Sequence, residues 1–333
     1  MTELRKDPIT GTWVILAEER GKRPAPPEKY ESIITKGGFC PFCEGNEKKT
    51  PPENFALRVK GSSPNSPGWR IRVVSNKYPA LTTNGELNPR GEGIYDKMNG
   101  IGLHEVIIEA PIHATRITHL SWDYIPDILE VYKNRLFNAS KDPRYRYGLI
   151  FKNTGISAGA TIEHNHSQLI ATPVIPITIA QEMAGAKKFF DYRGRCIYCD
   201  ILYQELENKK RIIIDGKSFV ALAPFASRFP FETWILPKKH CSHFTSIKEE
   251  ELLEMAKVLY DVLKKLDISL EEPPYNYVIH TAPFSENEIA YYHWHLEILP
   301  RTARLAGFEF GTGFHINSVP PETAAEEMRS IEI

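Results

Sequence analysis

The sequence lacks long hydrophobic runs and lacks an excess of charge of either sign. Its 333 residues carry 41 Lys and Arg against 42 Asp and Glu, a formal net charge of −1. Balanced charge does not favour a nucleic-acid or membrane-surface partner. No apolar stretch approaches the roughly 20 residues that a membrane-spanning helix needs, and the first residues lack the pattern of a signal peptide. We therefore expect a cytoplasmic protein with no membrane or nucleic-acid partner.

Cysteine is also scarce, with five residues in the chain. Four of them form two Cys-x-x-Cys pairs, Cys40 with Cys43 and Cys196 with Cys199. In a reducing compartment such pairs bind metal or carry out redox chemistry more often than they form structural disulfides. The fifth, Cys241, is expected to be a bystander thiol.

A repeat organises the residues that carry chemistry. Each half runs from a cysteine pair through one histidine to a His-x-His sequence. The first half orders Cys40-Pro-Phe-Cys43, His113 and His164-Asn-His166, and the second orders Cys196-Ile-Tyr-Cys199, His240 and His293-Trp-His295. The common order and similar spacing indicate a duplicated unit. We expect a catalytic domain at residues 1–175 and a degenerate copy at residues 176–333.

Hydrophobic periodicity predicts the secondary structure of each half. Strands are expected at residues 104–110, 147–153, 168–172, 211–215, 219–222, 233–236, 275–280 and 295–299. Apolar stripes predict one helix through Ile125, Leu129 and Leu136 and another through Leu252, Leu259 and Leu266. Residues 176–194 are expected to form a helix and linker, and residues 45–67 a surface loop. The pattern predicts an α+β protein of two tandem units with mostly antiparallel sheets flanked by helices.

The sequence His164-Asn165-His166-Ser167-Gln168 places polar side chains at alternate positions. On a strand these three, His164, His166 and Gln168, would share one face. The glycine-rich residues 155–161 just before them offer backbone N–H groups that could bind a diphosphate. His166 is therefore a candidate nucleophile, with Gln168 beside it. The alternative is a polar strand face whose histidines are simply hydrogen-bonded.

Cys40, Cys43, His113 and His164 form a Cys₂His₂ set. Four such ligands fit a closed tetrahedral zinc site of the structural kind. A metal bound there would hold His164, and would therefore orient His166 rather than activate a water molecule. The alternative is a pair of buried cysteines with incidental histidines.

Taken in order, these motifs resemble the galactose-1-phosphate uridylyltransferases, within the histidine-triad superfamily. The resemblance covers nearly the whole chain and is specific as an ordered set. It rests on Arg20-Gly-Lys-Arg23-Pro24, Cys40-Pro-Phe-Cys43, residues 72–81, Asn153, His164-Asn-His166-Ser-Gln168, His293-Trp-His295 and residues 307–313.

The resemblance implies a ping-pong mechanism. His166 would attack the α-phosphorus of UDP-glucose, release glucose 1-phosphate and pass the uridylyl group to galactose 1-phosphate. Gln168 would donate a hydrogen bond to a phosphoryl oxygen. The other substrate contacts implied are Arg20, Arg23, Asn76, Asn153, Gly159 and Thr161. The resemblance also implies a homodimer, with the two arginines reaching a sugar phosphate across its interface. The main interpretation is thus a UDP-glucose–hexose-1-phosphate uridylyltransferase.

A second metal site is expected in the second half. The repeat predicts a zinc site formed by Cys196, Cys199, His240 and His293. Some members of the family instead bind iron or zinc through one Glu and three His, and this alternative set is Glu182, His280, His293 and His295. Both sets need His293, so we expect only one to be filled. We favour the cysteine set because thiolates hold zinc strongly.

Departures from the family pattern leave the substrate open. Lys77 stands where the best-known uridylyltransferases carry aspartate, and Asn165 where they carry proline. These features resemble the branch that includes ADP-glucose phosphorylases, so adenylyl transfer is the alternative. Gln168 replaces the third histidine of triad hydrolases, which favours transfer to a phosphate over attack by water. A non-catalytic, zinc-stabilised nucleotide-binding protein is a lesser alternative, which leaves His166 unexplained.

Overall fold

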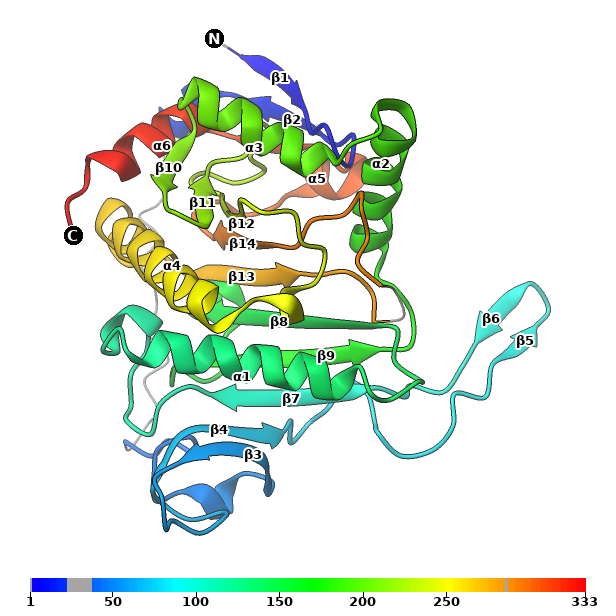
Figure 1. Ribbon diagram of the computed structural model, residues 1–333, viewed down its shortest axis with the longest axis vertical. Coiled ribbons are helices and arrows are strands. Elements are labelled where there is room, and N and C mark those ends of the chain that lie inside the picture. The colour runs from blue at the N-terminus through cyan, green and yellow to red at the C-terminus, as the bar shows by residue number, and fades with distance from the viewer. Residues whose placement is uncertain (1, 23–37, 285–286) are drawn as a thin grey trace.

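A computed structural model describes residues 2–22, 38–284 and 287–333, and the predicted α+β class is confirmed (Figure 1). The helices are α1 (Tyr124–Ala139), α2 (Ile177–Arg193), α3 (Ile197–Asn208), α4 (Glu249–Ser269), α5 (Gly307–Thr312) and α6 (Pro321–Ser330). The strands are β1 (Glu3–Lys6), β2 (Trp13–Leu16), β3 (Glu53–Arg58), β4 (Trp69–Ser75), β5 (Arg90–Glu92), β6 (Tyr95–Lys97), β7 (Leu103–Ile108), β8 (Tyr147–Thr154), β9 (His166–Thr172), β10 (Ile212–Asp215), β11 (Phe219–Leu222), β12 (Thr233–Pro237), β13 (Tyr275–His280), β14 (His295–Pro300) and β15 (His315–Asn317).

The central sheet has ten strands and a symmetric order. The order is β10-β11-β12-β14-β13-β8-β9-β7-β4-β3. Counted outward from the centre, the corresponding strands are β8 and β13, β9 and β14, β7 and β12, β4 and β11, and β3 and β10. Its neighbouring strands pair antiparallel. β8 and β13 meet at the centre, with Lys152 opposite Tyr277. The repeat seen in the sequence therefore corresponds to two matching halves of one continuous sheet.

Helices α1 and α4 cover one face of this sheet (Figure 1). Each buries a stripe at helical spacing, with Leu129 and Tyr132 among the buried residues of α1 and Leu259 and Leu263 among those of α4. Burying a leucine side chain contributes about 1.5–3 kcal/mol. At the start of α4, the Glu251 carboxylate accepts a hydrogen bond from the Lys248 main-chain N–H at 3.0 Å. This cap satisfies one of the otherwise unpaired N–H groups of the first turn.

The opposite face of the sheet carries the cysteine and histidine motifs. In β7, Ile107 packs into the core beneath α1, whereas Val106 and Ile108 pack with Cys40 and Phe42 on the other side. Alternation of side chains along each strand thus separates a helix-covered core from a layer that contains the candidate site.

Two local expectations require correction. Residues 45–67 do not form only a surface loop, because β3 lies within them and pairs with β4. The strand signal is weak there, since Glu53 and Asn54 open the strand. In addition, β9 begins at His166, so His164 precedes the strand. The helix expected after residue 176 is present as α2, and it ends at Gly194, whose φ of 69° suits a left-handed C-cap.

Smaller elements complete the fold. β15 pairs parallel with β2, and β2 pairs with β1, which ties the two ends of the chain together. The β5–β6 hairpin projects from the body of the molecule (Figure 1). Across residues 2–22, 38–284 and 287–333, the structure holds no helix that is both long and apolar enough to cross a bilayer.

Glu322 links three distant segments and gives a testable pH dependence. Arg5 donates to it at 2.8 Å and Arg211 at 2.6 Å. Burial alone would raise the pKa of Glu322, but the hydrogen bonds from both arginines lower it below its ordinary value of 4.5. A depressed folded-state pKa stabilises the protein above about pH 4.5, and this contribution is lost as the pH falls through the folded-state pKa.

We expect Glu322→Gln to lower the free energy of unfolding by about 1 kcal/mol at neutral pH. The difference from the native chain should shrink below about pH 4.5, where the native carboxylate is also neutralised. Urea unfolding at several pH values measures this, with the exposed Glu326→Gln on the same helix as the control. A difference that is unchanged at pH 3 would contradict the assignment.

Candidate active site

His166 is the first residue of β9 and is 8% exposed. Its Nδ1 lies 2.7 Å from the His164 main-chain oxygen, which can only accept a hydrogen bond, so Nδ1 carries the proton. The neutral ring therefore has its lone pair on Nε2. The Phe42 ring packs edge-to-face on this imidazole, with ring centroids 5.3 Å apart. The ring is thus held in one tautomer and one orientation, as a nucleophile requires.

The protonation state of His166 suits the same role. Burial is the main effect that lowers the pKa of the His166 imidazole to about 4, and nearby Lys152 lowers it further. The hydrogen bond to the His164 carbonyl opposes these effects. At neutral pH the ring is uncharged and Nε2 can attack an electrophile.

His166 and Gln168 open onto a cavity of about 460 Å³ on the face of the sheet away from α1 and α4. Its wall is partly apolar, with Phe42, Val74 and Ile162 among the lining residues. Polar groups of Asn76 and Thr161 lie on the same cavity. A pocket of this size with a few convergent polar groups suits a small organic ligand.

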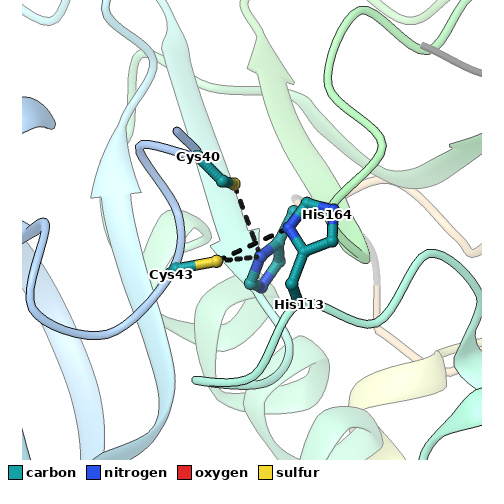
Figure 2. Close-up of side chains that lie close together, drawn as sticks. All are labelled: Cys40, Cys43, His113 and His164. Atoms are coloured by element: carbon teal, nitrogen blue, oxygen red, sulfur yellow. Dashed lines mark hydrogen bonds between the residues drawn. The ribbon is translucent and has the colours of Figure 1, made fainter. Parts of the chain in front are cut away.

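The first cysteine–histidine set converges beside His166. Figure 2 shows Cys40, Cys43, His113 and His164 close together. Their ligand atoms all lie within 4.8 Å of one another. The His164 Nδ1 lies 3.6 Å from both sulfur atoms, and the His113 Nδ1 lies 3.5 Å from Cys43 Sγ. His164 donates its Nε2–H to the Ala110 carbonyl at 2.8 Å, so its Nδ1 lone pair faces the thiols. This tautomer is the one that a metal ligand needs.

The second set is built in the same way in the other half of the sheet. Cys196, Cys199, His240 and His293 also bring their ligand atoms within 4.8 Å. His293 donates Nε2–H to the Pro237 carbonyl at 2.9 Å, and His240 donates to the Ile289 carbonyl at 3.0 Å. Both histidines therefore direct Nδ1 towards the sulfur atoms. The donor set and its geometry can hold a metal ion in each half.

The structure does not bring all members of the alternative second set together. Glu182, His280 and His295 do lie together, but Glu297 joins them in place of His293. As the structure places them, this group and the cysteine set share no residue. His293 and His295 are two residues apart, and the chain path directs His293 Nδ1 towards Cys199 Sγ at 3.7 Å, as the repeat predicted.

The carboxylates of the third group have hydrogen-bonding and ion-pair partners within the protein. His280 Nδ1 lies 3.0 Å from Glu182, and Tyr292 donates to the same carboxylate at 2.9 Å. Arg228 donates to Glu297 at 2.7 Å. His295, the counterpart of His166, has its Nε2 3.7 Å from Glu297. Glu182, His295 and Glu297 of this group line a cavity of about 160 Å³, which differs from the larger cavity beside His166 in containing two carboxylates of this group.

Behind His166, on the helix-covered face, lies a buried polar network that the sequence did not reveal. The Lys152 ammonium donates to Glu109 at 2.5 Å and to the His166 main-chain oxygen at 2.9 Å. Glu109 also accepts hydrogen bonds from Tyr132 and Ser167. The side chains of Lys152 and Glu109 are at most 1% exposed. The network therefore fixes the main chain of His166, the candidate nucleophile.

The remaining predicted contacts are only partly gathered at the cavity. Asn153 and Gly159 lie close together but do not line it: Asn153 accepts from Asn276 at 2.7 Å, and Gly159 takes a φ of 87° that suits glycine. Arg20 is exposed in the 3₁₀ turn Glu18–Lys22. The next residue, Gly21, lies beside Ser318 of the C-terminal half. Within one chain Arg20 does not line the His166 cavity. Arg23 lies outside the described residues.

Comparisons with known proteins agree with this geometry. Residues 1–176 match the domain described as galactose-1-phosphate uridyl transferase, N-terminal domain, and residues 182–332 match the corresponding C-terminal domain. An ADP-glucose phosphorylase from Arabidopsis thaliana is 39% identical, covering 99% of this chain and 93% of its own. A galactose-1-phosphate uridylyltransferase from Thermotoga maritima is 31% identical, covering 100% of this chain and 99% of its own.

Solved structures give the same result. A crystal structure of an ADP-glucose phosphorylase from Arabidopsis thaliana with bound ADP-glucose superposes with a TM-score of 0.85 at 38% identity, covering 100% of both chains. A uridylyltransferase structure superposes with a TM-score of 0.76 at 28% identity, covering 99% of this chain and 98% of the other. Sequence and fold thus point to the same group of proteins.

Proposed function

Because the chain belongs to the galactose-1-phosphate uridyl transferase family, we propose that it transfers a nucleoside monophosphate from a nucleoside diphosphate sugar to a phosphate acceptor through a covalent bond to His166. The observation that carries this proposal is the His166 imidazole itself. It is neutral, its Nδ1–H is bound to the His164 carbonyl, and its ring lies on a cavity with Gln168.

In the first step, Nε2 of His166 attacks the α-phosphorus of the substrate. An N–P bond forms while the bond from the α-phosphorus to the bridging oxygen breaks, and the sugar 1-phosphate leaves with that electron pair. The ring becomes positively charged, and the His164 carbonyl already accepts its Nδ1–H at 2.7 Å. This preformed hydrogen bond stabilises the charge as it develops.

In the second step, an oxygen of the incoming phosphate attacks the same phosphorus and His166 leaves as neutral imidazole. Neither leaving group needs a proton, because a sugar phosphate is already an anion at neutral pH and the imidazole departs uncharged. Gln168 suits such a site, since it donates to a phosphoryl oxygen without supplying an acidic proton.

We propose an adenylyl group as the transferred nucleotide, with ADP-glucose as the donor and inorganic phosphate or a sugar phosphate as the acceptor. The greater identity to an ADP-glucose phosphorylase than to the uridylyltransferases supports it. Lys77 on the cavity supports it too, because the best-known uridylyltransferases carry aspartate at that position. Adenylyl transfer, the alternative interpretation of the sequence, thus becomes the first candidate, and uridylyl transfer becomes the second.

Transfer of a uridylyl group between UDP-glucose and galactose 1-phosphate is the second candidate. It is favoured by the 31% identity to the Thermotoga maritima enzyme, which extends over the whole of this chain. The same histidine chemistry would serve, so the two candidates differ in base and acceptor alone.

We propose that the C-terminal half does not catalyse transfer. His295 corresponds to His166, yet its Nε2 faces the Glu297 carboxylate at 3.7 Å, and that carboxylate also accepts a hydrogen bond from Arg228 at 2.7 Å. A carboxylate at this position repels a phosphoryl group, whereas Gln168 in the first half attracts one.

We propose zinc at both Cys₂His₂ sets, since two thiolates and two imidazoles suit tetrahedral zinc better than iron. Bound zinc would hold His164 and so support the main chain that leads into His166. Metal analysis should find two equivalents of zinc per chain. Cys43→Ala and Cys199→Ala should each remove one equivalent, whereas Cys241→Ala, outside both sets, should remove none. Two equivalents retained in Cys43→Ala would contradict the first site.

Intact-mass spectrometry after separate incubation with ADP-glucose and UDP-glucose tests the proposed function. We expect an added adenylyl group from the first nucleotide and little or none from the second. A uridylyl adduct alone would favour the second candidate. Tight nucleotide binding without any adduct would favour the non-catalytic alternative.

A further inference from the structure

His104 lies on β7, which pairs with the strand that carries Gln168, and is half-buried. The Ala80 main-chain N–H, which can only donate, lies 3.1 Å from His104 Nδ1. Nδ1 must therefore accept, and in the neutral ring the proton sits on Nε2. That Nε2 lies 2.8 Å from Gln168 Oε1, so His104 donates to the oxygen of the Gln168 amide.

Asn76 makes a second, parallel contact. The Tyr78 main-chain N–H donates to Asn76 Oδ1 at 2.9 Å, which fixes the orientation of the Asn76 amide. Its Nδ2 amino group then lies 3.3 Å from Gln168 Oε1. The Asn76 amino group and the His104 Nε2–H thus both donate to Gln168 Oε1. The orientation of each donor is fixed by a main-chain N–H, from Tyr78 and Ala80 respectively. This explains why Asn76 Nδ2 and His104 Nε2 approach each other to 3.1 Å although both are donors.

The consequence concerns the other end of the Gln168 amide. With Oε1 held on the His104 side, the Nε2 amino group is left for a ligand in the cavity that Gln168 lines. The opposite orientation would present an oxygen to the phosphoryl group and would place the amino group against two donors. Both changes are unfavourable, because donors that face each other lose the acceptor that each one needs.

We propose that His104 is a positioning residue, which orients Gln168 so that its amino group donates to the phosphoryl oxygen during nucleotidyl transfer. This inference rests on the proposed function, because it assumes that Gln168 contacts the phosphoryl group. His104 itself touches no substrate in this arrangement and acts through Gln168 alone.

A mutant cycle between positions 104 and 168 tests the proposal. The variants are His104→Phe, Gln168→Ala and the double variant, with His119→Phe at an exposed position as the matched control. We expect His104→Phe to slow the single-turnover formation of the nucleotidyl enzyme about 10- to 100-fold, with unchanged affinity for ADP. In the Gln168→Ala background the same substitution should have no further effect, because the group it orients is gone.

Three results would overturn the proposal. One is a His104→Phe variant that keeps the native rate. Another is an equal loss of rate in both backgrounds, which indicates a structural role. The third comes from the native protein and needs no folded variant: ¹⁵N spectra should show His104 as the Nε2–H tautomer near neutral pH, and the Nδ1–H tautomer would contradict the hydrogen bonds. Native protein that forms no adduct contradicts the proposed function itself, whereas a native adduct with an unaffected His104→Phe variant contradicts this inference alone.

Discussion

We expect His166→Ala to slow nucleotidyl transfer by at least about 10⁴-fold, because removal of a nucleophile eliminates the covalent route. The loss should appear in the first half-reaction, the release of sugar 1-phosphate from the nucleotide sugar. Binding of the nucleotide should persist, since the apolar wall of the cavity is intact. Rapid-quench measurement of sugar 1-phosphate, with nucleotide affinity measured by calorimetry, separates the two effects.

His295→Ala is the matched control for this experiment, because His295 occupies the corresponding position in the other half and makes the corresponding bond to the His293 carbonyl. We expect the His295→Ala protein that is folded to transfer the nucleotide at close to the native rate. Comparable losses in both variants would show that the two histidines act together, contrary to the assignment of His166 as the one nucleophile.

The second large effect is expected on stability. Lys152→Met leaves the Glu109 carboxylate buried without its cation, and breaking a buried pair in this way costs about 3–5 kcal/mol. The variant also removes the donor to the His166 carbonyl, so the rate of nucleotidyl transfer should fall in the protein that remains folded. Chemical denaturation measures the first effect and single-turnover kinetics the second.

Two variants make the Lys152 result specific. Lys187→Met removes a lysine from an exposed pair with Asp191 and should cost less than about 1 kcal/mol. Lys152→Met combined with Glu109→Gln removes both buried charges and should recover part of the lost stability. A single Lys152→Met variant that is as stable as Lys187→Met would contradict a buried ion pair at this position.

Periodic patterns in the sequence were sufficient to predict the main helices and the α+β class. The stripe through Ile125, Leu129 and Leu136 is buried as expected, because i, i+3 and i+4 positions share one side of a helix. The order of motifs also predicted a duplication, which appears as the symmetric strand order of the sheet. Local periodicity determines the first feature, and the repeated order of motifs along the chain revealed the second.

Features that depend on pairing between distant segments could not be predicted in this way. The register of β8 with β13, which places Lys152 opposite Tyr277, has no local signal. Glu109 and Lys152 each resemble an ordinary polar residue in a strand, and only the folded chain brings them together. For the same reason, Glu297 was not recognised as the companion of Glu182.

The central claim is that the nucleotide becomes bonded to His166, and locating that bond tests it most directly. The protein would be mixed with ADP-glucose, digested under alkaline conditions that preserve a phosphoramidate, and sequenced by tandem mass spectrometry. The account predicts one modified peptide, with the nucleotide on His166, which disappears when phosphate is added before digestion. A nucleotide on a different residue, or sustained turnover with His166 unmodified throughout, would contradict it.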